Sequence, residues 1–224
     1  YKSTLYFLKL IFISKKYDVV FVSSSNFNRG INGENILLKP MIDICINNAS
    51  AVAPLPTEAT QMKRYDLMQE INTRGTFLTS KLCLPYLKKS THAHILTLSP
   101  PLDIDDKWFA PHVAYTISKM GMSLCTLGHA REFKRSSIGV NSLWPLTAID
   151  TAAVRNILGG ENVAKSSRDV SIMADAAFEI LGRDPKECSG NFFIDEVVLR
   201  DTGQKDFEKY RLSTNELIKR SSFL

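Results

Sequence analysis

The sequence predicts an α/β protein in which helices cover both faces of a doubly wound parallel sheet. Short apolar runs rich in β-branched residues alternate with longer segments of helical spacing, and no internal repeat interrupts the series. Strands that alternate with helices of this length form parallel crossover units. The chain has 224 residues, of which 44% are hydrophobic, which is enough for one substantial core. We therefore expect one globular domain.

The first half of the chain is expected to form two strands and a long helical region. "YDVVFVSSS" at 17–25 and "MIDICIN" at 41–47 are short apolar runs that end at polar residues, as buried strands do. Residues 58–88 have helical spacing, as two helices or as one with a bend, and Thr57 can cap the first turn. Pro85 falls near the end of this region, where the bend it causes costs less than in the centre.

The second half alternates regularly between strands and helices. "HAHILTLS" at 92–99 predicts a strand, and two prolines after it force an extended exit. Residues 111–133 have the spacing of a long helix, and "SIGVNSLWP" at 137–145 predicts a strand closed by a proline. A helix is expected over 169–181, and "GNFFIDEVVL" at 190–199 predicts the last strand.

Composition and charge exclude several classes of function. The chain carries 28 basic and 23 acidic side chains, a net charge of +5, without a basic run between aromatic residues, so we expect no nucleic-acid partner. "LYFLKLIFI" at 5–13 contains Lys9, is far shorter than a membrane span and lacks a signal-peptide pattern. The histidines lack metal-ligand spacing, so no metal is expected. The cysteines are too widely spaced for a zinc pattern or a disulfide framework, and reduced thiols are expected at Cys45, Cys83, Cys125 and Cys188.

Tyr115 and Lys119 are a candidate catalytic pair. At positions i and i+4 they share one face of the predicted helix. A tyrosine that exchanges protons at neutral pH needs its pKa lowered by about three units, or roughly 4 kcal/mol. One ammonium at about 4 Å supplies energy of that order at an effective dielectric constant of about 20. This spacing also occurs by chance on many helices, so the pair alone leaves both interpretations open.

Polar residues and prolines follow the predicted strands at their carboxyl ends. Asn47 ends the second strand, Ser99 the third, and Pro145 and Thr147 follow the fourth. In parallel α/β sheets, ligands bind in the crevice outside the carboxyl ends of the strands. This edge of the sheet is therefore the predicted site.

Five motifs occur together in a specific order and at specific spacing. They are "INNAS" at 46–50, "NTRGTF" at 72–77, "HILTLS" at 94–99, "YTISK" at 115–119 and "VNSLWP" at 140–145. Over about residues 41–200 the chain resembles the short-chain dehydrogenase/reductase family. The resemblance implies a Rossmann-like sheet that lacks its first strands, one of whose places "YDVVFVSSS" can take. It divides the chain into an atypical leader (1–40), a dehydrogenase-like domain (41–200) and a C-terminal tail (201–224) that is expected to be solvated and loose.

The resemblance implies roles for four candidate catalytic residues. Tyr115 is the general acid/base, and Lys119 lowers its pKa and binds the nicotinamide ribose. Asn72 matches the asparagine whose local helix distortion holds a water in the proton relay. Ser99 lies one position early for the serine that polarises the substrate oxygen, and Pro100 stands in that serine's place.

The same resemblance implies a nicotinamide cofactor, NADP or NAD. Asn47, Ala49 and Ser50 match the segment that passes beside the cofactor, and Pro145 and Thr147 fall on the loop that meets its nicotinamide end. Tyr115 and Lys119 contact it as well. The glycine-rich turn that binds the cofactor phosphates in this family has no match before residue 41. The alternative is therefore a catalytically inactive remnant that acts as a binding or dimerisation module.

The partners that the resemblance implies are small molecules and a second copy of the chain. The expected substrate is the carbonyl or alcohol of a lipid-like or steroid-like molecule. Helices over 71–89 and 111–134 would form a homo-oligomer. Trp108, Phe109 and Trp144 either line a substrate pocket or pack in the core. An intracellular protein is expected, in the peroxisome or mitochondrion by resemblance and otherwise in the cytoplasm.

Overall fold

A parallel sheet forms the centre of the protein. A computed structural model of the chain describes residues 19–22, 41–158, 160–213, 218 and 220–221. The strands lie in the order β1-β2-β3-β4-β5. Their bounds are β1 (Val19–Val22), β2 (Ile44–Asn47), β3 (His94–Thr97), β4 (Gly139–Trp144) and β5 (Phe192–Ile194). Each strand lies within an apolar run that predicts a strand, so the predicted parallel α/β architecture is confirmed.

The register of the strands brings their carboxyl ends to one edge. Asn47 at the end of β2 is paired with Thr97 at the end of β3, which is paired with Ser142 of β4. β1 pairs in parallel with β2, with Val22 opposite Asn47. The run at 17–25 therefore supplies a strand beside β2, in the place where the sheet was expected to lack one.

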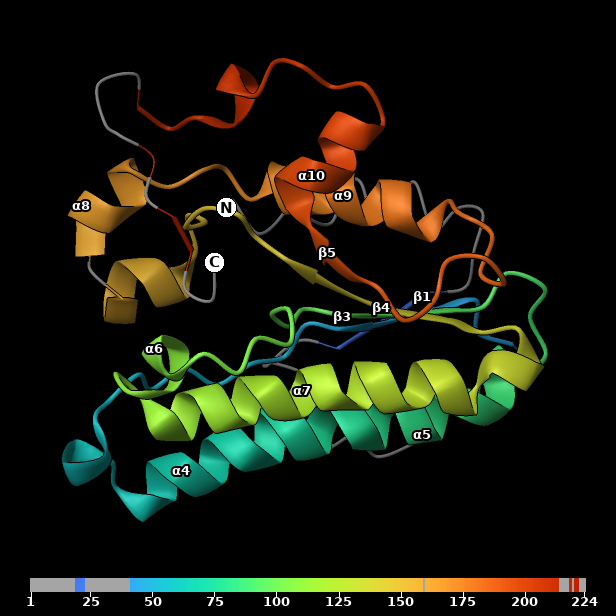
Figure 1. Ribbon diagram of the computed structural model, residues 1–224, viewed down its shortest axis with the longest axis horizontal. Coiled ribbons are helices and arrows are strands. Elements are labelled where there is room, and N and C mark those ends of the chain that lie inside the picture. The colour runs from blue at the N-terminus through green and yellow to red at the C-terminus, as the bar shows by residue number, and fades with distance from the viewer. Residues whose placement is uncertain (1–18, 23–40, 159, 214–217, 219, 222–224) are drawn as a thin grey trace.

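Three helical stretches cover one face of the sheet. α4 (Met62–Met68), a π-helical segment (Gln69–Arg74) and α5 (Gly75–Leu87) follow one another without a break and lie beside α7 (Val113–Glu132) (Figure 1). The bend predicted in this region is thus a widened π turn. Pro85 lies in the last turn of α5, as expected.

The start of this helical region differs from the prediction. Thr57 does not cap a long helix but begins a 3-10 turn (Thr57–Ala59) that follows Pro56. α4 begins only at Met62, and Gln61 at its N-cap makes no side-chain capping hydrogen bond. A threonine followed by an acidic residue is also suited to a short turn, so this pattern did not distinguish the two structures.

The other face of the sheet is covered by α9 (Ser171–Leu181) and α10 (Asp195–Asp201) (Figure 1). The strand predicted over 190–199 is wrong in its second half, because β5 ends at Ile194 and a helix starts at once. Two acidic residues in the first turn of α10 favour the helix N-terminus, where the backbone carries positive partial charge. Val198 and Leu199, which resemble the end of a strand in sequence, are buried helical residues.

Several short elements complete the described chain. They are α6 (Asp106–Phe109), α8 (Gly160–Lys165), a π-helical segment (Val154–Leu158) and two 3-10 turns, Lys134–Ser136 and Glu208–Tyr210. The segment after residue 200 was expected to be a loose tail, yet Phe207 and Tyr210 are buried in the core. The Tyr210 hydroxyl donates a hydrogen bond to Asp175 at 2.6 Å, which fixes this segment against α9.

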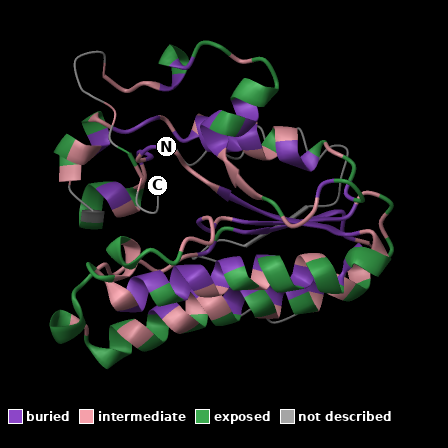
Figure 2. Ribbon diagram, viewed as in Figure 1, coloured by how far each residue is buried: buried purple, intermediate pink, exposed green. Residues whose placement is uncertain are grey.

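The core consists of one apolar layer on each face of the sheet. The layer under α9 and α10 includes Ile44, Leu96 and Leu143, and the layer under α5 and α7 includes Cys45 and Ile95. β2 and β3 are buried throughout and β4 is buried up to Leu143, whereas β5 is only partly buried and the outer sides of the helices are exposed (Figure 2). Alternate strand residues supply the two layers, as a sheet covered on both faces requires.

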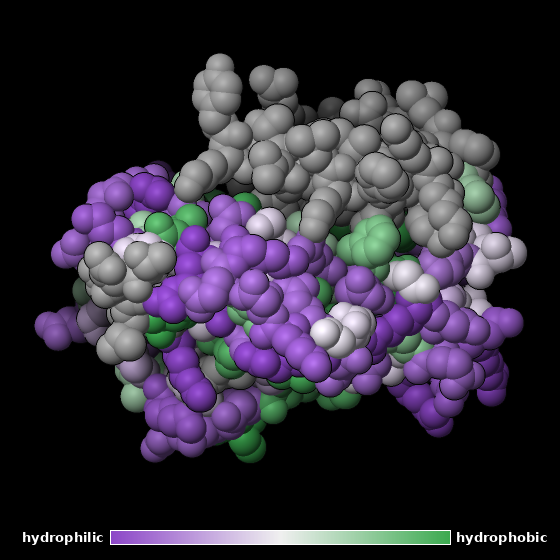
Figure 3. Space-filling model, turned by 90° about the horizontal axis from the view of Figure 1, so that it is seen from above, coloured by the Kyte–Doolittle hydropathy of each residue, from purple (hydrophilic) through white to green (hydrophobic). Residues whose placement is uncertain are grey.

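Both helical layers expose some apolar side chains on their outer surfaces. Phe77 of α5 and Leu124 and Leu127 of α7 are about half exposed, at 51%, 57% and 50%. Phe178 of α9 and Val197 of α10 are exposed to a similar extent, within a described surface that is otherwise mostly hydrophilic (Figure 3). Apolar groups on α5 and α7 are what the predicted interface between copies of the chain requires, and oligomerisation stays a prediction. Within the described residues, the structure contains no helix with the length and apolarity needed to cross a membrane.

Candidate active site

The predicted catalytic and cofactor-binding residues gather at the carboxyl edge of the sheet. The Asn47 carbonyl at the end of β2 accepts a hydrogen bond from the Leu98 amide at 3.0 Å. The Leu98 carbonyl in turn accepts from Lys119 Nζ at 2.7 Å, and this ammonium group lies 5.1 Å from the centre of the Trp144 ring. One chain of contacts therefore joins the ends of β2, β3 and β4 to α7.

Asn47 is held by its backbone and by one side of its amide. It is 3% exposed, and its Nδ2 donates to Ser80 Oγ of α5 at 3.1 Å. Ala49, also buried, and half-buried Ser50 continue the chain away from β2. These contacts fix the segment predicted to pass beside the cofactor at the edge of the sheet.

Asn72 ties the π segment to the rest of the site. It is fully buried, and its Oδ1 accepts from the Ala51 amide at 2.7 Å. Its Nδ2 donates to the Ala51 carbonyl at 3.0 Å and to Ser118 Oγ of α7 at 2.8 Å. The helix distortion predicted at Asn72 is confirmed, because residues 69–74 form a π turn. Ser118 was not predicted, although it lies inside the "YTISK" motif.

The π segment touches α7 at a glycine. A Cβ at Gly121 would lie 2.3 Å from Thr73 Oγ1 and 2.7 Å from its Cγ2, whereas a Cβ at Gly128 of the same helix would meet nothing within 4 Å. Thr73 Oγ1 also donates to the Ser118 carbonyl at 3.1 Å, which limits its ability to move aside. The close approach of these two elements thus depends on the absence of a side chain at Gly121.

Alanine at these two glycines is expected to have opposite effects. Gly128→Ala should stabilise the protein by roughly 0.5–1 kcal/mol, because alanine is the better helix former. Gly121→Ala should destabilise it by about 1–3 kcal/mol through overpacking against Thr73, despite the same gain in helix propensity. Urea unfolding followed by circular dichroism measures both. Equal stabilisation by the two changes would contradict the packing described for the π segment.

Lys119 is a buried cation with few partners. It is 2% exposed, and Nζ donates to the Leu98 carbonyl at 2.7 Å and lies 3.2 Å from Met122 Sδ. Burial lowers its pKa to about 7, since the surrounding groups do not replace the water that a charged amine loses. At neutral pH Lys119 is therefore close to half protonated.

Tyr115 lies one turn before Lys119 and is also buried, at 8% exposure. Its ring meets the His112 ring edge to face, with centres 5.6 Å apart. Burial raises the pKa of Tyr115 above its ordinary value, so the lowering expected from Lys119 is not found in the chain alone. Burial disfavours the charged form of both side chains, and it is the cause of the shift at each of them.

Ser99 and the loop after β3 are anchored to the same helix. Ser99 is fully buried, and the adjacent Pro100 carbonyl accepts a hydrogen bond from Ser123 Oγ of α7 at 2.7 Å. Trp108, Phe109 and Trp144 are partly buried and pack in the apolar cluster that contains Tyr115. They therefore belong to a satellite core at the site.

Four of the predicted site residues have a side-chain polar atom that is buried without a hydrogen-bond partner among the described residues. They are Asn47 Oδ1, Ser50 Oγ, Ser99 Oγ and Thr147 Oγ1. Such atoms also occur elsewhere, at His94 for example, but this group comes from residues that the sequence places at one site. Buried polar groups nearly always have partners, so these four suit a polar ligand or ordered water.

The loop after β4 is held by a residue that the sequence reasoning missed. The Leu146 amide donates to Asp195 Oδ1 at 2.8 Å, and the Glu196 amide donates to the same atom at 2.7 Å. Pro145 and Thr147 flank this contact, and Thr147 is buried. The signal in the sequence that points to Asp195 is an acidic pair directly after a strand, because that position faces the carboxyl edge of the sheet.

Among the described residues there is no group of three or more histidine, cysteine or acidic side chains that could hold a metal.

Comparison with known proteins agrees with this geometry. Residues 38–179 match the family model described as enoyl-(acyl carrier protein) reductase. Hydroxysteroid dehydrogenase-like protein 2 of Xenopus tropicalis is 56% identical over 172 residues, which cover 77% of this chain and 40% of that protein. The motifs "INNAS", "NTRGTF" and "AYTISK" predict a resemblance to this member of the family, and the comparison confirms it. The chain thus spans less than half the length of this relative.

Solved structures show the same fold. A protein from Xanthomonas campestris assigned as a dehydrogenase has a TM-score of 0.81 and 41% identity, covering 86% of this chain and 70% of that one. A gluconate 5-dehydrogenase from Burkholderia cenocepacia, solved with NADP and tartrate, has a TM-score of 0.61 and 18% identity, covering 72% and 66%. The family model, the sequence relative and the Xanthomonas structure agree that this chain belongs to the short-chain dehydrogenase/reductase family.

Proposed function

We propose that this chain is an oxidoreductase that moves a hydride between a nicotinamide dinucleotide and the carbonyl or alcohol carbon of a small molecule. The observation that carries the proposal is the group of four unpaired buried polar atoms at the sheet edge to which Lys119 is joined through the Leu98 carbonyl. A general acid/base, a buried amine and orphaned amide and hydroxyl groups at one sheet edge are the parts that such a reaction needs.

The residues at this edge fit a nicotinamide dinucleotide. Asn47, Ala49 and Ser50 would pass beside it, and Pro145 and Thr147 would meet its nicotinamide end. The amide and hydroxyl oxygens of Asn47, Ser50 and Thr147 lack partners and suit the polar groups of a ribose or a carboxamide. NADP or NAD is proposed, and the fold accommodates NADP in the gluconate 5-dehydrogenase.

Tyr115 would exchange a proton with the substrate oxygen. The bound nicotinamide supplies or accepts the hydride. Lys119 would bind the nicotinamide ribose and, when protonated, stabilise the tyrosinate form of Tyr115. Asn72 fixes the spacing between the segment at Ala51 and α7, and the π turn around it would hold a water in the proton relay. Ser99 would polarise the substrate oxygen through its unpaired hydroxyl.

The substrate that suits this site is lipid-like or steroid-like. Tyr115 packs among apolar and aromatic side chains, including Trp108 and Trp144, which favour an apolar carbonyl compound over a sugar. The peroxisomal or mitochondrial location stays a prediction, since no described residue bears on it.

An inactive binding or dimerisation module is the second candidate. Two observations favour it: the pKa of Tyr115 is raised rather than lowered in the chain alone, and apolar side chains are exposed on α5 and α7. Cofactor binding distinguishes the two candidates, because only the enzyme requires it.

Titration with NADPH and NADH, followed by nicotinamide fluorescence, is expected to give saturable binding in the micromolar range. Thr147→Val removes one unpaired buried hydroxyl at nearly constant volume and should weaken binding about fivefold, the value of one ordinary hydrogen bond. Thr57→Val, the same change at an exposed position, is the control and should leave affinity unchanged. Absence of binding up to millimolar cofactor would rule out the enzyme proposal for this chain.

A further inference from the structure

We propose that Asp195 is a positioning residue that holds the loop at Pro145–Thr147 against the nicotinamide side of the site. This inference rests on the proposed function, because the loop matters only if a dinucleotide binds there. Asp195 is fully buried at the junction of β5 and α10, where its carboxylate contacts both the start of the helix and the loop after β4.

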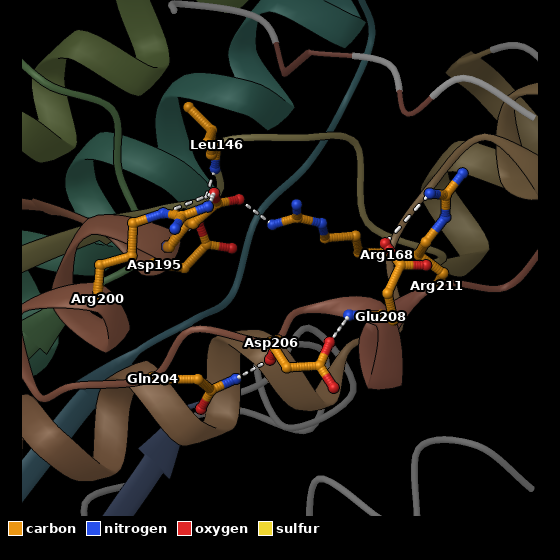
Figure 4. Close-up of polar contacts among 9 residues, drawn as sticks. Leu146, Arg168, Asp195, Arg200, Gln204, Asp206, Glu208 and Arg211 are labelled. Atoms are coloured by element: carbon orange, nitrogen blue, oxygen red, sulfur yellow. Dashed lines mark hydrogen bonds and ion pairs between the residues drawn. The ribbon is translucent and has the colours of Figure 1, made fainter.

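The contacts of Asp195 join two segments that are distant in sequence. Oδ1 accepts from the Leu146 amide at 2.8 Å and from the Glu196 amide at 2.7 Å. The first bond leaves the helix and reaches the centre of the loop, between the two residues predicted to meet the cofactor (Figure 4). Oδ2 is buried and has no hydrogen-bond partner among the described residues. The carboxylate thus holds the loop backbone through one hydrogen bond and the start of α10 through the other.

A second layer of contacts holds the far end of this loop. The Arg168 amide donates to the Ala148 carbonyl and the Arg168 carbonyl accepts from the Asp150 amide, both at 2.9 Å. The Arg168 guanidinium pairs with Oε2 of Glu196, and Arg200 donates to Oε1 of the same carboxylate. The loop is therefore clamped at Leu146 by Asp195 and at residues 148–150 by Arg168.

The charges around Asp195 make its ionisation state matter. Burial is the main effect and raises its pKa to about 6, while the two backbone hydrogen bonds and Arg168 oppose the rise. Burial likewise disfavours ionised Glu196, but its hydrogen bonds from Arg200 and Arg168 outweigh this and lower its pKa. The charged and titratable groups that face Asp195 and its neighbours are Arg168, Glu196, Arg200, Tyr210 and Asp175.

A positioning role and a stabilising role predict opposite results for Asp195→Asn. The raised pKa means that the folded chain holds this proton more tightly than the unfolded chain, so the buried charge costs stability above about pH 6. Asparagine removes that charge and keeps an acceptor oxygen. The variant should therefore be at least as stable as the wild type at pH 7.5 and should bind NADH or NADPH several-fold more weakly, because neutral hydrogen bonds are about half as strong as charged ones.

Asp195→Leu removes the acceptor altogether and should weaken cofactor binding by about tenfold or more, since the Leu146 amide loses its partner. Hydrogen exchange on the cofactor-free protein gives an independent measurement, with the Leu146 amide expected to exchange at least about tenfold faster in this variant. Asp201→Asn, at an exposed position of the same helix, is the control.

The pH profile of cofactor affinity completes the test. Wild-type affinity should fall as the pH decreases from 7 to 5, while Asp195→Asn should lack the part of this change that Asp195 causes. The cofactor phosphates titrate in the same way with both proteins, so their effect cancels in the difference between the wild-type and Asp195→Asn profiles. Unchanged Leu146 exchange in Asp195→Leu, or equal affinity in all variants, would overturn the positioning role while the proposed function stands. If the wild type binds no cofactor but Leu146 exchange responds as expected, the proposed function fails, and with it the role of this contact in cofactor binding.

Discussion

Replacing Tyr115 by phenylalanine is expected to reduce turnover by at least about 10³-fold while cofactor affinity stays within about twofold of the wild type. The change removes only the hydroxyl that would exchange a proton with the substrate oxygen. The ring and its edge-to-face contact with His112 remain, so the apolar cluster around position 115 should be preserved. Turnover is measured by NADPH or NADH oxidation with a panel of apolar ketones and steroid ketones.

Tyr86→Phe is the matched control for this experiment. Tyr86 is a partly buried tyrosine of α5 in the core layer on the same face of the sheet, and it is not one of the proposed site residues. Its replacement should leave both turnover and affinity unchanged. Retained turnover in Tyr115→Phe would show that another group transfers the proton. Lost cofactor binding would instead mean that the hydroxyl holds the cofactor.

Replacing Lys119 by methionine is expected to abolish activity and to change how stability depends on pH. The folded pKa of about 7 lies below the ordinary 10.5, so between these values the unfolded chain binds more protons than the folded one. Wild-type stability therefore gains about 3 kcal/mol from this residue as the pH rises from 7 to 9.5. Methionine does not titrate. The free energy of unfolding of Lys119→Met, relative to that of the wild type, should therefore fall by about 3 kcal/mol between pH 7 and pH 9.5.

Urea unfolding of both proteins at pH 7 and pH 9.5 measures this difference. Other titrating groups, such as Cys45, occur in both chains and cancel. The difference in stability between the two proteins at pH 7 also contains the cost of the Leu98 carbonyl, which loses its hydrogen-bond donor in Lys119→Met. Lys81→Met, an exposed lysine of α5, is the control and should show no pH-dependent difference. If Lys119→Met also showed no pH-dependent difference from the wild type, the ammonium group of Lys119 would be solvated in the folded wild-type protein.

The strands and the long helix could be predicted because their signals are local. The runs at 44–47, 94–97 and 139–144 are short and apolar, and residues 113–132 keep helical spacing over five turns or more. The region after β5 could not be predicted in this way. Val197, Val198 and Leu199 form a β-branched and apolar run, but they are helical, with Val198 and Leu199 buried in the core and Val197 half exposed.

The site was predictable in its membership but not in its electrostatics. The ends of the predicted strands placed Asn47 and Ser99 at one edge, because parallel strands end together. The family resemblance added Asn72, Tyr115 and Lys119, which lie on helices. The pKa values of the pair depend on burial, which a sequence motif does not contain. Asp195 was missed because its partner, the Leu146 amide, is a backbone group 49 positions away.

The π turn between α4 and α5 makes chain length at this point as important as residue identity. A π turn accommodates one more residue than the α-helix around it. Deleting one residue between Met68 and Gly75 would allow regular α-helix with the same number of turns, so the face of α5 that carries Ser80 and Cys83 would still point toward the sheet. The widened turn that carries Asn72 would be lost. The number of residues in this segment, and not only the identity of their side chains, therefore specifies where Asn72 meets α7.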